Sequence, residues 1–256
     1  MSDVRVHTWE PNSNAGKPLF ALNEKGVAFE HVYVSLTDFE QHAPEYLKLN
    51  PAGTVPTMVH GDLVLTESTP MCEYIDRTFP GPRLVPDDPL ARYRMRDWCR
   101  RTDLAAAALS VIGWHNFMGP MVRQKPPEEL ERLIARIPTK ERRIFWATAA
   151  KATFTEQQLA DARAKVGAWA ATMDRRLAES AYLAGPDYSL ADLVAFANFY
   201  ALTSTVPEYA NRATTPHLLD WLGRIYARPA TMATFALGRS LSRRAIDIKA
   251  GLEQAA

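Results

Sequence analysis

Short runs of apolar side chains, separated by turn-forming residues, occupy the first eighty residues of the chain. Alternating and β-branched runs predict strands, whereas apolar positions three and four residues apart predict helices. The predicted elements are strands at residues 4–9, 29–34, 57–59 and 63–65 and helices at residues 18–25 and 67–78. Gly26 ends the first helix, and the turn at residues 60–62 joins the last two strands as a hairpin. The predicted order is therefore βαβ, a further helix, and ββα.

The rest of the chain has helical spacing after an interruption by prolines. Residues 79–89 cannot continue a helix and show no strand alternation. Helices are predicted at residues 90–111, 156–179 and 190–202, with two shorter ones between His217 and Gly238. We therefore expect a first domain at residues 1–80, a linker at residues 81–89 and a helical domain at residues 90–256.

An insertion at residues 113–155 is rich in aromatic and sulfur-containing side chains. They include Trp114, Phe117, Met118, Met121, Phe145, Trp146 and Phe154. This density exceeds what a solvated connection requires, and it favours the wall of an apolar substrate pocket. Ordinary helix packing explains any one of these residues equally well, so the pocket prediction concerns the group.

Charge and composition exclude several classes of partner. The 256 residues include 30 Lys and Arg against 29 Asp and Glu, and the net charge of +1 gives no general attraction for nucleic acid or an anionic membrane. No segment has the ~20 continuous apolar residues of a membrane span, and no signal-peptide core begins the chain. We therefore expect a cytoplasmic protein with neither a nucleic-acid nor a membrane partner.

The only two cysteines, Cys72 and Cys99, each lie in a helical pattern. A disulfide framework and a zinc site are therefore not expected, and no metal cofactor is predicted. Both thiols are predicted to be small buried hydrophobic side chains.

The segment around Pro56 and the helix start at Glu67 together suggest a peptide-binding edge. An X-Pro bond that closes a Gly-containing turn predicts a cis peptide, which leaves the main chain of Val55 free to pair with an extended peptide. Glu67 and Ser68 form the first turn of a helix whose free N–H groups attract carboxylate. A small zwitterionic peptide fits such a site. Taken alone, Pro56 more commonly ends a loop and Ser68 more commonly caps a helix.

Six motifs in this order give the chain a resemblance to a known family. They are Phe39-Glu40-Gln41-His42, Asn50-Pro51-x-Gly53-x-Val55-Pro56, Thr66-Glu67-Ser68-Thr69, Ile112-Gly113-Trp114, Tyr188-Ser189-Leu190-Ala191-Asp192-Leu193 and Ala227-Arg228-Pro229-Ala230. Over nearly its whole length the chain resembles the glutathione S-transferases, and most strongly the S-stereospecific branch of the bacterial glutathione-dependent β-etherases of lignin catabolism. The resemblance implies an α/β N-terminal thioredoxin-like domain plus an all-α C-terminal domain.

The resemblance also implies how glutathione is bound. His42 and Gln41 are expected to meet the glycyl carboxylate, and Val55 to pair with the cysteinyl main chain. Glu67 and Ser68 are expected to bind the γ-glutamyl end. In the family, an acceptor site lies between this peptide site and the start of the second domain. Its expected lining is Trp9, Pro11, Trp114, Phe117, Met118 and Met121.

The chemistry is expected just after the first strand, at residues 9–18. The N–H groups and positive dipole end of a helix starting there favour a thiolate, and a side-chain donor stabilises the sulfur further. Related etherases carry an Asn-Ser pair shortly before Lys-Pro, which matches Asn14 but places Ala15 where the hydroxyl would be. Asn14 is therefore the predicted thiolate donor and Ser13 the second candidate, although Ser13 is alternatively a helix cap.

The implied reaction is cleavage of a β-aryl ether bond in a lignin-derived aromatic ketone. Glutathione, as co-substrate, attacks as the thiolate, and a phenol is released. Two alternatives stay open. The first alternative is a general glutathione-conjugating transferase, because fold and peptide site do not determine the acceptor substrate. The second alternative is a non-catalytic ligand-binding or assembly protein, because Ala15 stands where the expected hydroxyl would be. The family also implies a homodimer.

Ser189 and Asp192 stand three residues apart at a predicted helix start. A hydroxyl and a carboxylate at this spacing satisfy free N–H groups reciprocally, so we interpret both as structural. Charged residues predicted to be solvated surface without a catalytic role are Lys17, Asp38, Lys48, Arg243 and Arg244.

Overall fold

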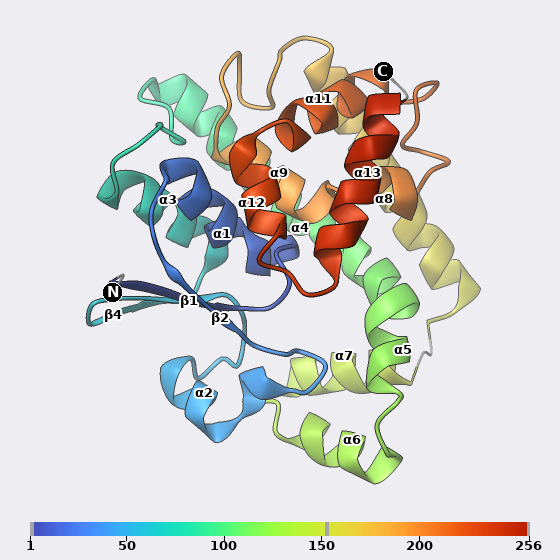
Figure 1. Cartoon of the computed structure of the whole chain (residues 1–256). Coiled ribbons are helices and arrows are strands. Elements are labelled where there is room, and N and C mark those ends of the chain that lie inside the picture. Colours follow the sequence, from blue (N-terminus) through green and yellow to red (C-terminus); the bar gives the residue numbers. More distant parts are fainter. Residues whose placement is uncertain (1–2, 152–153, 255–256) are drawn as a thin grey trace.

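The computed structural model describes residues 3–151 and 154–254 and consists of a small sheet domain and a larger helical domain (Figure 1). Residues 1–2, 152–153 and 255–256, which belong to the predicted domain ranges, lie outside the described part. The strands are β1 (Val4–Thr8), β2 (Glu30–Tyr33), β3 (Thr57–His60) and β4 (Leu63–Leu65). All four predicted strands are thereby confirmed, with ends shifted by a residue or two.

The sheet has the order β2-β1-β3-β4, with β1 parallel to β2 and antiparallel to β3. The parallel pair needs a crossover, which α1 (Ser13–Lys25) supplies. In the antiparallel pair His7 faces Thr57, so the residues just before Thr57 lie beside the end of β1. This register brings the predicted cis-proline segment next to the predicted reaction segment.

Helix α1 begins at Ser13 rather than at the predicted Pro18, so the predicted start is wrong. Proline favours the first turn of a helix, but here it lies in the interior. Because Pro18 has no N–H group, it donates no helical hydrogen bond to the carbonyl of Asn14. The predicted end is confirmed, since Gly26 adopts the left-handed conformation after Lys25.

Helices lie on both faces of the sheet. In Figure 1, α1 and α3 (Ser68–Thr78) lie on one face and α2 (Pro44–Leu49) on the other. A short 3₁₀ helix, η1 (Glu40–His42), precedes α2. The first domain thus has a thioredoxin-like order with α1 and α3 turned toward the second domain.

The second domain is helical. Its main helices are α4 (Pro89–Gly113), α8 (Glu156–Leu177), α9 (Leu190–Phe199), α10 (Leu202–Thr205), α11 (Pro216–Tyr226), α12 (Pro229–Phe235) and α13 (Leu241–Gln254). The predicted helices from residues 90 and 156 and the two short helices before Gly238 are confirmed. The helix predicted at residues 190–202 ends earlier, at Phe199, and α13 had no counterpart among the predicted elements.

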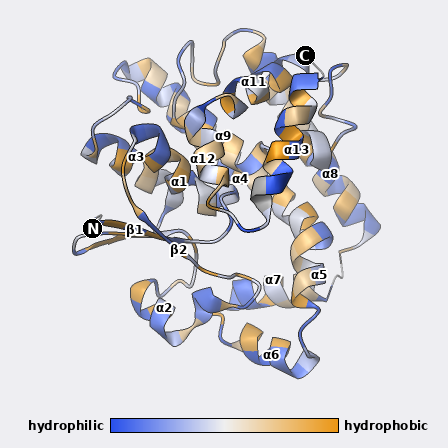
Figure 2. Cartoon of the chain, viewed as in Figure 1, coloured by the Kyte–Doolittle hydropathy of each residue, from blue (hydrophilic) through white to orange (hydrophobic). Residues whose placement is uncertain are grey.

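The two domains share a hydrophobic interface built on α1, α9 and α12. Every residue of α9 is buried. Phe20 of α1 makes edge-to-face contacts with Phe196 of α9 at 5.8 Å and Phe235 of α12 at 5.5 Å between ring centroids. Figure 2 shows hydrophobic residues along the strands and polar residues on the outward surfaces of the helices. This packing fixes the start of α1 against the second domain.

The insertion forms its own helices and a second small core. It contains the π-helical η2 (Trp114–Met118), α5 (Gly119–Val122), α6 (Pro127–Ala135) and α7 (Lys140–Ala150). Its buried core members are Trp114, Val122, Ile137, Trp146, Ala149 and Ala150, together with Phe39 of the first domain. The rings of Phe39 and Trp146 are 4.7 Å apart. The insertion therefore packs against the segment that leads into η1, below the sheet in Figure 1.

The predicted capping box of α9 is confirmed. Asp192 accepts a hydrogen bond from the N–H of Ser189 at 3.1 Å, and the Ser189 hydroxyl accepts one from Ala191 at 3.3 Å. Asp192 also accepts from the N–H of Leu183 and from the indole of Trp221, each at 2.9 Å. Its role is structural, because these donors belong to three different segments of the helical domain.

One prediction about surface charge is wrong. Lys17 is completely buried, and its ammonium group donates to Asp103 at 2.5 Å and to Thr69 at 3.3 Å. The charge is tolerated because Asp103 of α4 supplies a counter-ion between the domains. Asp38, Lys48 and Arg243 are exposed as predicted, and Arg244 is half-buried.

Cys72 and Cys99 are free and buried, which confirms the prediction for both. Burial raises the pKa of the Cys72 thiol to about 12 and the pKa of Cys99 further still. Within the described ranges, no three or more His, Cys, Asp or Glu side chains come together in a metal-binding group. The same part of the chain has no helix that is both long and apolar enough to cross a membrane.

Candidate active site

The peptide bond between Val55 and Pro56 is cis, as predicted. The loop before it is held firmly, because the carbonyl of Thr54 accepts hydrogen bonds from the Tyr46 hydroxyl at 2.6 Å and from the Asn50 amide at 2.9 Å. The main-chain groups of Val55 form no backbone hydrogen bond to another described residue. Val55 is partly exposed, so an extended peptide can pair with it.

The start of α3 carries the two residues predicted for the γ-glutamyl end. Glu67 is the exposed N-cap residue and Ser68, which is 9% exposed, is the first residue of the helix. No side chain caps this helix start. Its first N–H groups and dipole therefore favour an anionic group, while the Glu67 carboxylate suits an ammonium group.

The start of α1 carries the two candidate thiolate donors. Asn12 is the N-cap residue without a side-chain capping bond, and Ser13 and Asn14 are both exposed in the first turn. Ser13 has a φ of 50°, in the left-handed region that residues other than glycine seldom adopt. Ser13 does not cap the helix, so the alternative structural interpretation of its hydroxyl is wrong.

These three segments converge at one end of the sheet. The register of β1 and β3 places Val55 beside the end of β1, from which the chain turns into α1. The first turns of α1 and α3 are neighbours, because Lys17 donates a hydrogen bond to Thr69. The two helix starts make this place favourable for anions, whereas the charge of Lys17 is balanced by Asp103.

Gln41 and His42 lie against the same loop but are buried, at 0% and 1% exposure. Gly53, at a φ of 60°, allows this close approach, since an added Cβ would lie 2.8 Å from Cδ2 of His42. Burial and the charges of Arg142 and Arg136 lower the pKa of His42 to about 4, although the main chain of Gly53 opposes the shift. His42 is therefore a neutral imidazole at physiological pH.

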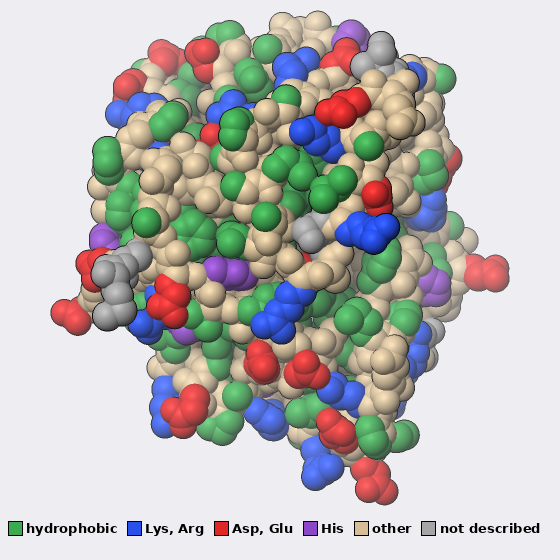
Figure 3. Space-filling model, viewed as in Figure 1, with side chains coloured by type: hydrophobic (Ala, Val, Ile, Leu, Met, Phe, Trp, Pro, Cys, Tyr) green, Lys and Arg blue, Asp and Glu red, His purple; other side chains and the backbone are tan. Residues whose placement is uncertain are grey.

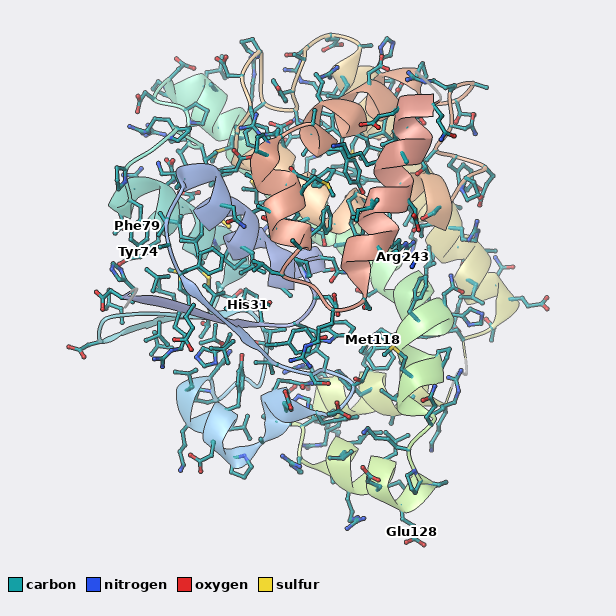
Figure 4. The ribbon with its side chains drawn as sticks, viewed as in Figure 1. His31, Tyr74, Phe79, Met118, Glu128 and Arg243 are labelled. Atoms are coloured by element: carbon teal, nitrogen blue, oxygen red, sulfur yellow. The ribbon has the colours of Figure 1, made fainter. Side chains whose placement is uncertain are left out.

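The residues predicted to line an acceptor pocket differ in how far their side chains are exposed. Trp114 is 8% exposed and contacts Trp146 at 4.7 Å in the second core, whereas Phe117 and Met121 are 48% and 45% exposed. Figure 4 shows Met118 on the inner side of the helix formed by η2 and α5, facing the sheet domain. Trp9 is partly exposed and Pro11 is buried beside the start of α1. The lining therefore stays a prediction for these residues as a group.

Several residues of this region had no predicted role. Glu10 is buried next to the reaction segment, where its carboxylate accepts from the Tyr33 hydroxyl at 2.9 Å and from the N–H of Ser240 at 3.1 Å. It thereby holds the start of α13. Gly238 permits this contact, since an added Cβ would lie 2.7 Å from Glu10 Oε2.

Arg244 of α13 lies over the ring of Phe117 at 4.8 Å and donates to Ser204 at 2.9 Å. The exposed ring of Phe117 thus has a cation beside it at the predicted acceptor side. On the face shown in Figure 3, Lys and Arg side chains are interspersed with Asp and Glu rather than gathered by sign. Attraction for an anionic ligand therefore depends on the local groups of the site.

Comparison with known proteins agrees with this geometry. Residues 11–83 match the glutathione S-transferase N-terminal domain, and residues 137–229 match the glutathione S-transferase C-terminal domain. The chain is 36% identical over 239 residues to protein LigF of Sphingobium sp., covering 91% of this chain and 93% of that protein.

Solved structures show the same relationship. The crystal structure of β-etherase LigF matches with a TM-score of 0.86 and 35% identity, covering 92% of this chain and 99% of that one. A theta-class glutathione S-transferase from Xanthomonas axonopodis with glutathione bound matches with a TM-score of 0.69 and 25% identity, covering 92% and 98%. The predicted thioredoxin-like and all-α architecture and the similarity to a β-etherase are confirmed, and the chain belongs to the glutathione S-transferase family.

Proposed function

We propose that this protein is a glutathione-dependent β-etherase that cleaves the β-aryl ether bond of lignin-derived aromatic ketones. The observation that carries the proposal is the match to the β-etherase LigF, at 36% identity over 91% of this chain. The peptide site supports it, because the free main chain of Val55 and the uncapped start of α3 suit a small zwitterionic peptide.

The proposed chemistry begins with an ionised thiol at the start of α1. Thiol groups have a pKa of ~8.5, and lowering it by ~2 units requires about 2.7 kcal/mol of preferential stabilisation of the thiolate. The helix dipole and one hydrogen bond from the exposed Asn14 amide, with Ser13 as a second donor, supply most of this amount.

The thiolate then attacks the carbon that bears the aryloxy group beside the ketone. A carbon–sulfur bond forms as the carbon–oxygen bond breaks, and the electron pair leaves with the phenolate, which takes a proton from solvent. The adjacent carbonyl activates this carbon. The residues of the chain bind and orient both substrates and hold the sulfur anionic, which lowers the barrier by positioning and electrostatics.

A β-aryl ether ketone incubated with glutathione and the protein tests the proposal. Each enantiomer is supplied separately, and chromatography measures phenol and thioether. We expect phenol release equal to glutathione consumption. Turnover of generic aryl halides without phenol release from the ether would instead support a general conjugating transferase. Glutathione binding with an unshifted thiol pKa and no turnover would support a non-catalytic binding protein.

We also propose that the protein forms a homodimer, as is usual in its family. An exposed apolar surface supports this: Leu63 and Val64 of β4 are 52% and 44% exposed, and Leu90 and Tyr93 of α4 are 55% and 67% exposed. We call these four residues the outer face. Scattered apolar residues are normal, but several large apolar side chains exposed on β4 and on the start of α4 are the kind of surface that an interface covers.

A cytoplasmic location completes the proposal. Both cysteines are reduced and buried rather than paired in a disulfide, as is common for proteins of reducing compartments. Retention of activity in the soluble fraction of cells, with none in periplasmic extracts, is the expected result of fractionation.

A further inference from the structure

Arg244, near the start of α13, is a half-buried cation without a carboxylate partner in the described part of the chain. Its Nη2 group donates to two hydroxyls of α10, Ser204 Oγ at 2.9 Å and Thr205 Oγ1 at 3.3 Å. The Nε and Nη1 groups have no acceptor among the described residues. A guanidinium group is always charged in proteins, and burying part of it without a counter-ion is unfavourable. The remaining N–H groups of Arg244 therefore suit an anionic atom of a ligand.

The guanidinium group of Arg244 lies at the predicted acceptor side of the site. It is 4.8 Å from the ring centroid of Phe117, which is 48% exposed on η2. Figure 1 shows the start of α13 beside the helix that ends in α5. An exposed aromatic ring offers a face on which a second ring can stack, and the cation next to it supplies donors. The pair of side chains therefore suits an aromatic group that carries a negative oxygen.

A buried tyrosine connects Arg244 with the start of α1. Tyr200, which is 3% exposed, follows α9, and its hydroxyl forms a hydrogen bond with the side chain of Asn12, the N-cap residue of α1. Burial raises the pKa of Tyr200, whereas the charge of Arg244 and the Asn12 contact both lower it. Arg244 and the helix start that is proposed to hold the thiolate thus act on the same hydroxyl group.

Cleavage of an aryl ether places negative charge at two atoms, the attacking sulfur and the departing oxygen. The start of α1 serves the sulfur, and the oxygen needs a donor of its own. As the carbon–oxygen bond breaks, its electron pair goes to the phenolate oxygen, whose conjugate phenol has a pKa of ~10. A guanidinium group has a pKa above ~12, so it can donate a hydrogen bond to this oxygen while keeping its proton. The phenolate then leaves as an anion and takes its proton from solvent.

We propose that Arg244 is a catalytic residue that donates a hydrogen bond to the departing phenolate oxygen, while the ring of Phe117 supports the leaving aryl group. The inference rests on the proposed etherase function and names the group that meets the leaving oxygen. The hydroxyls of Ser204 and Thr205 hold Nη2 in place before the reaction. Such a preorganised donor lowers the barrier most when the leaving phenol is a weak acid, because its anion is then least stable without help.

Two β-aryl ether ketones that differ only in the leaving phenol test the proposal. One releases unsubstituted phenol, and the other releases para-nitrophenol, a stronger acid whose anion is stabilised by its own ring. We expect Arg244→Gln to lower kcat/KM about 100-fold for the phenyl ether and less than about fivefold for the nitrophenyl ether. Chromatography of the released phenols at saturating glutathione measures both rates.

Matched variants separate this role from folding and from glutathione binding. Arg244→Lys retains the charge and should recover part of the activity on the phenyl ether. Arg243→Gln is the control, because Arg243 is the exposed neighbour on the same helix and its loss changes the net charge equally. It should cleave both ethers like the wild type. Circular dichroism melting curves establish folding, and calorimetric glutathione affinity should vary less than about twofold among the variants.

Binding of a product analogue gives a second readout that needs no turnover. The protein is first saturated with S-methylglutathione, which carries no thiolate, and is then titrated with para-nitrophenolate or with nitrobenzene, which lacks the anionic oxygen. We expect the wild type to bind the phenolate about tenfold or more tightly than nitrobenzene, and Arg244→Gln to lose this preference. Equal wild-type affinity for the two compounds would refute an anion site at Arg244.

The outcomes distinguish this inference from the proposed function. Equal losses of activity on the two ethers in Arg244→Gln would indicate a merely structural role and overturn the inference, while phenol release by the wild type would leave the etherase function intact. A folded wild-type protein that binds glutathione but releases phenol from neither ether would overturn the proposed function and this inference with it.

Discussion

Asn14 and Ser13 offer different donors at the start of α1, where both side chains are exposed. We expect Asn14→Ala to lower kcat about 10- to 100-fold, with a smaller change in glutathione affinity, because the donor acts mainly on the charged sulfur. The pKa of bound glutathione, followed by thiolate absorbance in the ultraviolet, should rise in this variant. Ser13→Ala is the comparison and should have the smaller effect. The reverse order of effects would assign the role to Ser13.

His42 predicts how stability depends on pH. Its pKa is lowered from 6.5 to about 4, chiefly by burial, so the unfolded chain binds the proton first as the pH falls. The free energy of unfolding should therefore decrease as the pH falls from about 6.5 toward about 4. Urea denaturation of the ligand-free protein measures this slope.

His42→Gln should flatten that part of the stability curve, whereas substitution of the exposed His217 by Gln should leave it unchanged. An identical slope in the wild type and His42→Gln would show that other groups cause the dependence.

Single residues show where the sequence was informative about the site. The cis bond at Pro56 followed from local turn chemistry. The burial of Lys17 did not, because its partner Asp103 is remote in sequence. A charge whose neighbours come from other segments cannot be placed by local spacing.

At the scale of elements, the capping box of α9 connects several segments. Asp192→Ala would leave the N–H groups of Leu183 and Ser189 and the indole of Trp221 without their acceptor. We expect the free energy of unfolding to fall by about 2–4 kcal/mol, because these donors are buried. Urea denaturation followed by tryptophan fluorescence measures the change.

Asp192→Asn retains an acceptor oxygen and should lose less stability. Asp161→Ala, at an exposed position of α8, should change the free energy of unfolding by less than about 0.5 kcal/mol. Equal stability of Asp192→Ala and Asp161→Ala would contradict a structural role for the capping box.

Elements with strong periodicity or clear ends were predicted well. The hairpin of β3 and β4 and the long helices α4 and α8 are examples. The start of α1 was missed because Pro18 lies inside the helix, where packing against the second domain outweighs its local preference. Helix α13 was not predicted. Its buried apolar stripe is narrow, consisting of Ala245, Ile248 and Leu252, and the residue that holds its start, Glu10, lies in the first domain.

At the scale of the whole molecule, the outer face predicts an assembly of two chains. Tyr93→Glu places a charge on that face and should convert the dimer into a monomer, because burying an unpaired carboxylate costs several kcal/mol. Sedimentation velocity measures the mass. Ile246→Glu is the control, since Ile246 is 55% exposed on α13 and lies outside the outer face.

A wild-type protein that sediments as a monomer would refute the proposed dimer, and a dimeric Tyr93→Glu would move the interface away from the outer face. The sequence suggested the assembly only through its family. Exposure of Leu63, Val64, Leu90 and Tyr93 is a property of the folded surface, because the sequence pattern alone is equally compatible with these side chains facing the core.

The anchoring of α13 by Glu10 has a practical consequence for protein engineering. Deleting this last helix would free the segment before it, and displacing the Arg239 and Ser240 amides would take two donors from Glu10, four positions upstream of Asn14. A buried carboxylate with fewer donors would carry more negative charge toward the site, which would repel an anionic sulfur and work against its formation. Tags and truncations at the carboxyl end should therefore be judged by catalytic assay, since expression yield alone would not register the damage.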